Sequence, residues 1–255
     1  MKKPHVGVSI IGVSLSLITS ANAGLIFSDS FGYPNGSLVG QGGWTETGGG
    51  GVNPIQVNNE RVSLAGAGQD AGHALTVPNT PGTSFYIGMD VKLSVAKDAG
   101  DYFLHVTSGS GFYDRLWAKK NDSSTFFLGL SPGGSATPTY GTTPLSQGQD
   151  YRIVIAHSFG GSADALALYV NPSGPGDTPY ASASGGALAA AVSAINLRQG
   201  DGTKAPTFEL DNLAVTDNFL EAVPEPSTYL AGCFSAGLLA MTFRARNARS
   251  MSGKA

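Results

Sequence analysis

Residues Ser84 to Ala96 read SFYIGMDVKLSVA, with an apolar side chain at every second position from Phe85 to Val95. Side chains of a β-strand point alternately to its two faces. This alternation therefore predicts a strand with one face in a core and the other face partly exposed to solvent. The run is long for a strand, which indicates a broad sheet.

Shorter alternating runs follow along the chain, at residues 102–106, 126–130, 151–155 and 166–170. Turn sequences rich in Gly and Pro separate them, at residues 108–111, 131–134 and 171–174. No amphipathic helix is evident. The Ala- and Ser-rich stretch 180–192, which has no charge, is predicted to be a loop, with a short helical turn as the alternative. Together these patterns predict an all-β fold, an antiparallel β-sandwich over residues 24–219.

Charge is unevenly distributed, since residues 24–219 hold nine Lys and Arg against 16 Asp and Glu. A protein that binds phosphate backbones needs the opposite balance, so nucleic acid is not an expected partner. The single cysteine, Cys233, lies in an apolar C-terminal run. The predicted β domain therefore has neither an internal disulfide nor a thiolate metal site.

The N-terminus has the features of a secretory signal peptide. Lys2 and Lys3 precede an apolar run from Val6 to Ile18, and residues 21–23 read ANA, a cleavage pattern of small residues. We expect cleavage after Ala23.

The C-terminus has three parts in a fixed order. A linker, residues 220–228, contains Pro224, Glu225 and Pro226, and an apolar segment at 229–243 follows it. The tail, residues 244–255, then contains Arg244, Arg246 and Arg249. We interpret 229–243 as a short transmembrane helix, with the basic tail cytoplasmic and the β domain on the outer side.

This order of a Pro-Glu-Pro unit, an apolar helix and an Arg-rich end resembles the PEP-CTERM sorting signal. The resemblance covers about the last thirty residues. It implies processing by an exosortase-type enzyme in a Gram-negative bacterium that makes exopolysaccharide, with transient anchoring in the inner membrane before delivery to the cell surface or extracellular matrix. The alternative is an ordinary C-terminal membrane anchor behind a Pro-rich linker.

A second resemblance concerns the two ends of the β domain. Residues 27–31 (FSDSF), 33–38 (YPNGSL) and 42–44 (GGW) resemble the opening of concanavalin A-like lectin/glucanase domains, and residues 208–215 (FELDNLAV) are similar to their closing strand. The resemblance implies a jelly roll of two packed antiparallel sheets.

Catalysis of the laminarinase type is not expected. Members of that class carry a Glu-x-Asp-x-x-Glu strand, and the nearest candidate here, Glu209-x-Asp211, has Ala214 in place of the second Glu. No Gly-x-Ser-x-Gly elbow, His pair at metal-ligand spacing or phosphate-binding loop occurs in the sequence. The protein is therefore predicted not to be an enzyme, and no cofactor is expected.

Two kinds of binding residue remain as candidates. Aromatic side chains can stack on sugar rings, and the candidates for glycan contact are Trp44, Tyr113, Trp117 and Tyr140, with core packing as the alternative role. Asp29 and Asp211 are candidate ligands of a structural calcium ion, because the first and last strands could bring them together.

Three functions are left open by the sequence. The first is a non-catalytic surface or matrix protein associated with exopolysaccharide. The second is a lectin-like carbohydrate-binding module, and the third is a glycoside hydrolase with an unrecognised site. A fold alone cannot choose between them.

Overall fold

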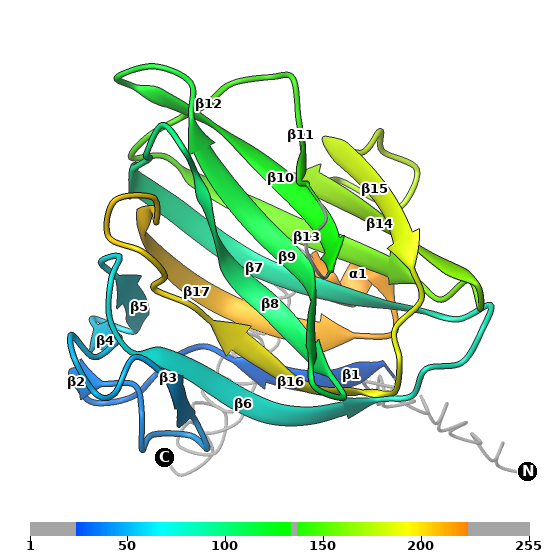
Figure 1. Cartoon of the computed structure of the whole chain (residues 1–255), viewed down its shortest axis with the longest axis horizontal. Helices are drawn as coiled ribbons and strands as arrows, with labels where there is room; N and C mark the ends of the chain where they lie inside the picture. Colours follow the sequence, from blue (N-terminus) through cyan, green and yellow to red (C-terminus); the bar gives the residue numbers. More distant parts are fainter. Residues whose placement is uncertain (1–23, 134–136, 224–255) are drawn as a thin grey trace, which may run out of the picture.

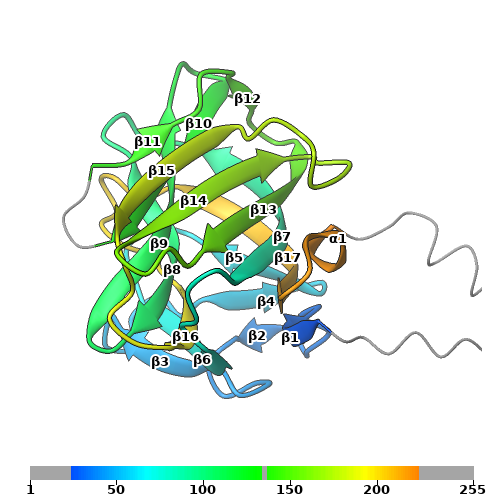
Figure 2. The same ribbon diagram turned by 90° about the vertical axis from the view of Figure 1, so that its right-hand side faces the viewer.

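The computed structural model describes residues 24–133 and 137–223. They form two antiparallel β-sheets packed face to face (Figure 1). Sheet A has the order β15 (Ala181–Gly186), β14 (Ala163–Val170), β13 (Asp150–Ser158), β7 (Ser84–Val95), β17 (Thr207–Thr216), β5 (Arg61–Leu64), β4 (Gln56–Asn58) and β2 (Gly36–Ser37), and β1 (Leu25–Asp29) also pairs with β17. Figure 2 shows β15, β14, β13 and β7 side by side in this sheet.

Sheet B packs against sheet A. Its order is β11 (Thr139–Tyr140), β10 (Thr125–Gly133), β9 (Gly111–Lys120), β8 (Asp101–Ser108), β16 (Val192–Leu197), β6 (Asp70–Val77) and β3 (Thr45–Gly48), and β12 (Leu145–Ser146) also pairs with β10. The predicted fold class, an antiparallel β-sandwich, is confirmed.

The strand with the clearest alternation is β7, near the middle of sheet A. Its five inward side chains are at most 1% exposed, whereas Tyr86, Asp90 and Lys92 on its other face are only partly buried. Burying each large apolar side chain contributes on the order of 1.5–3 kcal/mol. The sequence pattern therefore corresponds directly to the core face of this strand.

The opening and closing segments of the domain lie next to each other. Asp29 of β1 is paired with Leu213 of β17, and Phe27 is paired with Val215. The first and last strands are thus neighbours in one sheet, as expected when Asp29 and Asp211 were considered together.

One expectation is wrong. The stretch 180–192, predicted to be a loop, contains β15 and the first residue of β16. In β15 the alternating residues are Ala and Ser, so the two faces of the strand differ too little in hydrophobicity for the sequence to indicate a strand. Backbone pairing with β14, in register from Ala163↔Gly186 to Leu168↔Ala181, holds this segment extended.

The short helix α1 (Phe219–Ala222) continues the packed structure into the predicted linker. The side chain of Asn218 caps it by accepting a hydrogen bond from the backbone N–H of Leu220. Phe219 contacts the rings of Tyr86 and Tyr169 edge to face, at 5.5 and 5.1 Å. Residues up to Ala222 therefore pack against sheet A.

Several predicted features lie outside the described residues. They are the signal peptide, the Pro224-Glu225-Pro226 unit, the apolar segment 229–243 with Cys233, and the basic residues Arg244, Arg246 and Arg249. Within residues 24–133 and 137–223, no helix has the length and apolar character needed to cross a membrane.

Candidate functional site

Three aromatic residues lie in one row across four strands of sheet B. Tyr102 of β8 is paired with Trp117 of β9, Trp117 with Gly129 of β10, and Gly129 with Tyr140 of β11. Directly paired residues of antiparallel strands project from the same face. Leu116 and Leu128, their neighbours in sequence, are buried in the core, so the row lies on the outer face of the sheet.

The rings in this row are partly exposed and fixed in orientation. The centroids of Tyr102 and Trp117 are 5.3 Å apart at an interplanar angle of 56°. The indole N–H of Trp117 donates a hydrogen bond of 2.9 Å to Oγ of Ser131. Because its polar edge is satisfied within the protein, the indole ring is held in place before any ligand arrives.

Tyr140 extends over the sheet from its edge. A Cβ added to Gly129 would lie 2.7 Å from its ring, and one added to Gly100 would lie 3.1 Å from its hydroxyl, so both glycines make room for it. Burial, followed by the charge of Asp101, raises the pKa of Tyr140 to about 12. Its phenol is therefore a neutral hydrogen-bonding group at physiological pH.

Two guanidinium groups flank the row. The Cζ atoms of Arg115 and Arg198 lie 4.9 and 4.2 Å from the ring centre of Tyr102. Arg198 is ion-paired with Asp101 at 2.9 Å. Arg115, in contrast, forms no ion pair with any residue in 24–133 or 137–223, and its buried Nε has no hydrogen-bond partner there.

His105 lies beside this group and is 5% exposed. Burial lowers its pKa to about 3, and the charges of Arg115 and Arg198 act in the same direction. The imidazole is therefore neutral at physiological pH. Its ring packs 4.5 Å from that of Phe112, an exposed aromatic side chain at the end of the same face. We call this surface the sheet B face; it comprises Tyr102, His105, Phe112, Arg115, Trp117, Lys119, Tyr140 and Arg198.

The four aromatic residues proposed from the sequence separate into two groups. Trp117 and Tyr140 belong to the sheet B face. Trp44 is 1% exposed, and its indole N–H donates to Asp29, so it is a core residue and cannot provide an exposed contact. Tyr113 is partly buried and packs against the core.

Tyr102, Arg115 and Arg198 are not among the residues proposed from the sequence. The signal that could have found Arg115 is the period of β9, where Arg115, Trp117 and Lys119 alternate with the buried Leu116 and Ala118. Tyr102 and Arg198 could not be found from the sequence in this way, because they join the row only through the pairing of β8 with β9 and β16 in the fold.

The two proposed calcium ligands have other partners. The carboxylate of Asp29 accepts hydrogen bonds from the backbone N–H of Phe31, the hydroxyl of Tyr33 and the indole of Trp44. Asp211 accepts a hydrogen bond from the backbone N–H of Asn212 and is paired across the sheet with Asp90. In the part of the chain that the structure describes, no three His, Cys, Asp or Glu side chains form a group that could hold a metal ion.

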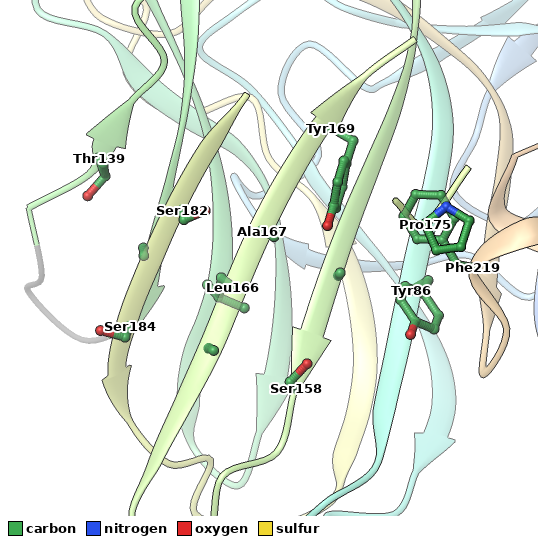
Figure 3. A pocket seen from close by; sticks show the side chains of 13 residues that line it. Tyr86, Thr139, Ser158, Leu166, Ala167, Tyr169, Pro175, Ser182, Ser184 and Phe219 are labelled. Carbon is green, nitrogen blue, oxygen red and sulfur yellow. The ribbon is translucent and has the colours of Figure 1, made fainter. Parts of the chain in front are cut away.

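A groove of about 710 Å³ crosses the outer face of sheet A (Figure 3). Its floor consists of small side chains of β13, β14 and β15, with Tyr86, Tyr169, Pro175 and Phe219 at one end. Hydroxyl groups of Ser158, Ser182 and Ser184 face it, and none of the described residues that line it is charged. This groove is chemically neutral, unlike the sheet B face.

A buried charged cluster links the two sheets. Nδ1 of His157 (β13) is hydrogen-bonded to Asp114 (β9) at 2.8 Å. Its Nε2 lies 3.3 Å from Asp164 (β14), an ion-pair distance without hydrogen-bond geometry. All three side chains are at most 3% exposed. No substrate can reach them, so the cluster is structural.

Comparison with known proteins gives a likeness in structure only. No family model matches the sequence, and no curated protein is similar to it in sequence. The pseudo β-1,3-glucanase Rv0315 of Mycobacterium tuberculosis matches with 12% identity over 76% of this chain and 99% of its own, at a TM-score of 0.49. The carbohydrate recognition domain of Emp47p matches with 10% identity over 78% of this chain and 96% of its own, at a TM-score of 0.47.

An endo-1,3-β-glucanase from Streptomyces sioyaensis matches with 13% identity over 79% of this chain and 99% of its own, at a TM-score of 0.45. Identities and TM-scores this low carry no argument about what the present chain binds.

Proposed function

We propose that this chain is an exported, non-catalytic surface or matrix protein that binds polysaccharide on the sheet B face. The observation that carries this proposal is the row of Tyr102, Trp117 and Tyr140, held in register across four strands and partly exposed. Aromatic faces are electron-rich, so they attract the C–H groups of a sugar ring. An open face several strands wide suits an extended chain of sugars.

The charges on this face argue against hydrolysis. Glycoside hydrolysis normally uses two carboxyl groups on either side of the scissile bond. On β9 the only acidic residue is Asp114, which is directed into the core, and Asp101 on β8 is ion-paired with Arg198. We therefore propose binding without turnover.

Binding can be tested with the full-length protein and a panel of polysaccharides, including the exopolysaccharide of the producing cells. We expect Trp117→Ala to weaken binding at least about tenfold, which corresponds to roughly 1.4 kcal/mol. The matched control is Tyr169→Ala, which removes a ring from the groove on sheet A. Equal binding by Trp117→Ala and wild type would contradict the proposal, as would release of new reducing ends from any polymer.

Export and sorting are the second part of the proposal, and they rest on the terminal sequences. We propose removal of the signal peptide after Ala23, transient anchoring in the inner membrane through residues 229–243, and processing at the Pro-Glu-Pro unit by an exosortase-type enzyme. Mass spectrometry of the exported protein should find Gly24 at its N-terminus. An intact Met1 on exported material would contradict this cleavage.

Replacing Pro224, Glu225 and Pro226 with Ala tests the sorting step. The two prolines restrict the backbone and remove two N–H donors, which favours an extended, accessible segment. The triple variant keeps the apolar segment and the basic tail, so we expect it to be exported and inserted but to accumulate uncut in the membrane fraction. Normal release of this variant would favour an ordinary membrane anchor.

A further inference from the structure

Among residues 24–133 and 137–223, the cation Arg115 has no counterion, although this domain has an excess of acidic residues. Between residues 24 and 219 acidic residues outnumber basic ones by 16 to nine, yet Arg115, Lys119 and Arg198 gather on the sheet B face. Asp101 neutralises Arg198. For Arg115, no carboxylate of the described residues lies within ion-pair distance, although many are available in the chain.

The surroundings of Arg115 make this missing partner costly. Its Nε is buried without a hydrogen-bond partner among the described residues, and the guanidinium packs over Tyr102 at 4.9 Å. The residue paired with it on β10, Ser131, uses its hydroxyl to accept the hydrogen bond of Trp117. The Nη1 and Nη2 atoms of Arg115 are not among the buried atoms without a partner, so this side of the half-buried guanidinium is open to a ligand. An anion from outside that pairs with these two groups would supply the charge that the described residues do not.

Arg115 also stands next to the proposed sugar platform. It lies two residues from Trp117 on β9, so the two side chains leave the same face about 7 Å apart. One sugar unit carrying an acidic group can therefore stack on the indole and reach the guanidinium.

We propose that the sheet B face binds a carboxylated polysaccharide, with the carboxylate of a uronic acid unit paired to Arg115 and a sugar ring of the same chain stacked on Trp117. This inference rests on the proposed polysaccharide binding and specifies its ligand. The planar guanidinium matches the two oxygens of a carboxylate. Three cations, of which Arg198 is already paired with Asp101, are too few in an acidic domain for the many phosphate contacts that nucleic acids require.

The test uses the full-length protein and polygalacturonate as the probe. The same polymer after chemical reduction of its carboxyl groups provides a neutral polymer with the same backbone, and dextran sulfate provides a different anion. Wild type should bind polygalacturonate at least about tenfold more tightly than the reduced polymer. Added salt should reduce this difference in affinity, because the ion pair between Arg115 and the carboxylate is near the surface, where salt screens it.

Three variants locate the effect. Arg115→Gln should bind polygalacturonate at least about tenfold more weakly and lose the preference over the reduced polymer. Arg115→Lys should retain part of the preference for polygalacturonate, because an ammonium group keeps the positive charge but lacks the two parallel N–H donors of a guanidinium. The charge-matched control, Lys92→Gln on the outer face of sheet A, should bind both polymers as wild type does.

The outcomes separate this inference from the function on which it rests. If Trp117→Ala abolishes binding while wild type binds the native and reduced polymers equally, the inference is overturned and sugar binding remains. If wild type binds none of the polymers, both the inference about Arg115 and the proposed polysaccharide binding are contradicted. A last outcome concerns unspecific attraction between charges. If dextran sulfate binds more tightly than polygalacturonate, and Lys92→Gln weakens the binding of polygalacturonate as much as Arg115→Gln does, the inference is overturned. If Arg115→Gln does not fold, Arg115→Lys and the reduced polymer still decide.

Discussion

His157 lies at the centre of a buried charged group that spans the sandwich. Burial lowers the pKa of this imidazole, but the hydrogen bond and charge of Asp114 and the charge of Asp164 outweigh it, so the net shift is upward. Burial also raises the pKa of Asp114. In both cases the folded state holds protons more tightly than the unfolded chain.

This arrangement predicts that stability falls as pH rises. The contribution of His157 is complete below its unfolded pKa, about 6.5, and is lost as pH rises through the higher folded value. Urea denaturation measured from about pH 6 to pH 9 should show a falling free energy of unfolding. Asp114→Asn should reduce the slope, because it removes the larger of the two carboxylate contributions that raise the pKa of His157. An unchanged slope in this variant would contradict the assignment.

The same cluster should be costly to break. Asp114→Ala leaves a buried imidazole without its hydrogen-bonded partner, so we expect a loss of about 3–5 kcal/mol in the free energy of unfolding at pH 6. The matched control is Asp98→Ala, which breaks the surface ion pair with Lys120 at 3.1 Å and should cost less than about 1 kcal/mol. Equal losses in the two variants would show that burial of the pair has no role.

Ile153 tests the predicted core in the same way. It is fully buried on β13, so Ile153→Asp should lower the free energy of unfolding by several kcal/mol, on the order of 3–5, because it buries an unpaired charge. Lys92→Ala on the outer face of β7 should change it by no more than about 0.5 kcal/mol. Thermal or urea unfolding of both variants provides the comparison.

At the scale of elements, helix α1 and strand β7 meet at a glycine. A Cβ added to Gly88 would lie 2.2 Å from the carbonyl oxygen of Ala222. Arg152 holds the same carbonyl through hydrogen bonds from Nε and Nη2, of 3.0 and 2.6 Å. Close approach of the helix to the sheet therefore depends on a residue without a side chain.

Gly88→Ala should displace α1 while leaving the sandwich folded. We expect faster proteolysis near residues 219–223 and a loss of about 1–3 kcal/mol, since the clash is with backbone. Gly186→Ala is the control, because a Cβ there meets no atom within 4 Å. If the two variants were digested at the same rate, Gly88 would not determine how α1 docks.

For the whole molecule, the described residues contain a continuous core between two complete sheets. Residues 24–223 should therefore fold cooperatively without either terminal segment, with a far-UV circular dichroism spectrum typical of β-structure and a single unfolding transition. A spectrum dominated by helix, or aggregation of this fragment under conditions where the full chain is soluble, would contradict the prediction.

The period-two pattern of the sequence was enough to predict the fold class and the strands with large apolar residues. In these strands every second side chain faces the core and is apolar, so the buried positions can be recognised from residue type alone. The pattern could not predict β15, whose Ala and Ser residues differ little in hydrophobicity and which is held by backbone pairing with β14. Residue type alone identified Trp117 and Tyr140 as candidates for glycan contact, together with Trp44 and Tyr113, because aromatic faces can stack on sugars.

Only the tertiary structure decided which candidates share a surface. Trp44 is internal because its indole has a buried partner in Asp29, 15 residues away in sequence. Tyr102, Arg115 and Arg198 come together because β8 pairs with β9 on one side and β16 on the other, a juxtaposition of residues up to 96 positions apart. Strand pairing at long range is set by packing of the whole core, so no local pattern in the chain specifies it.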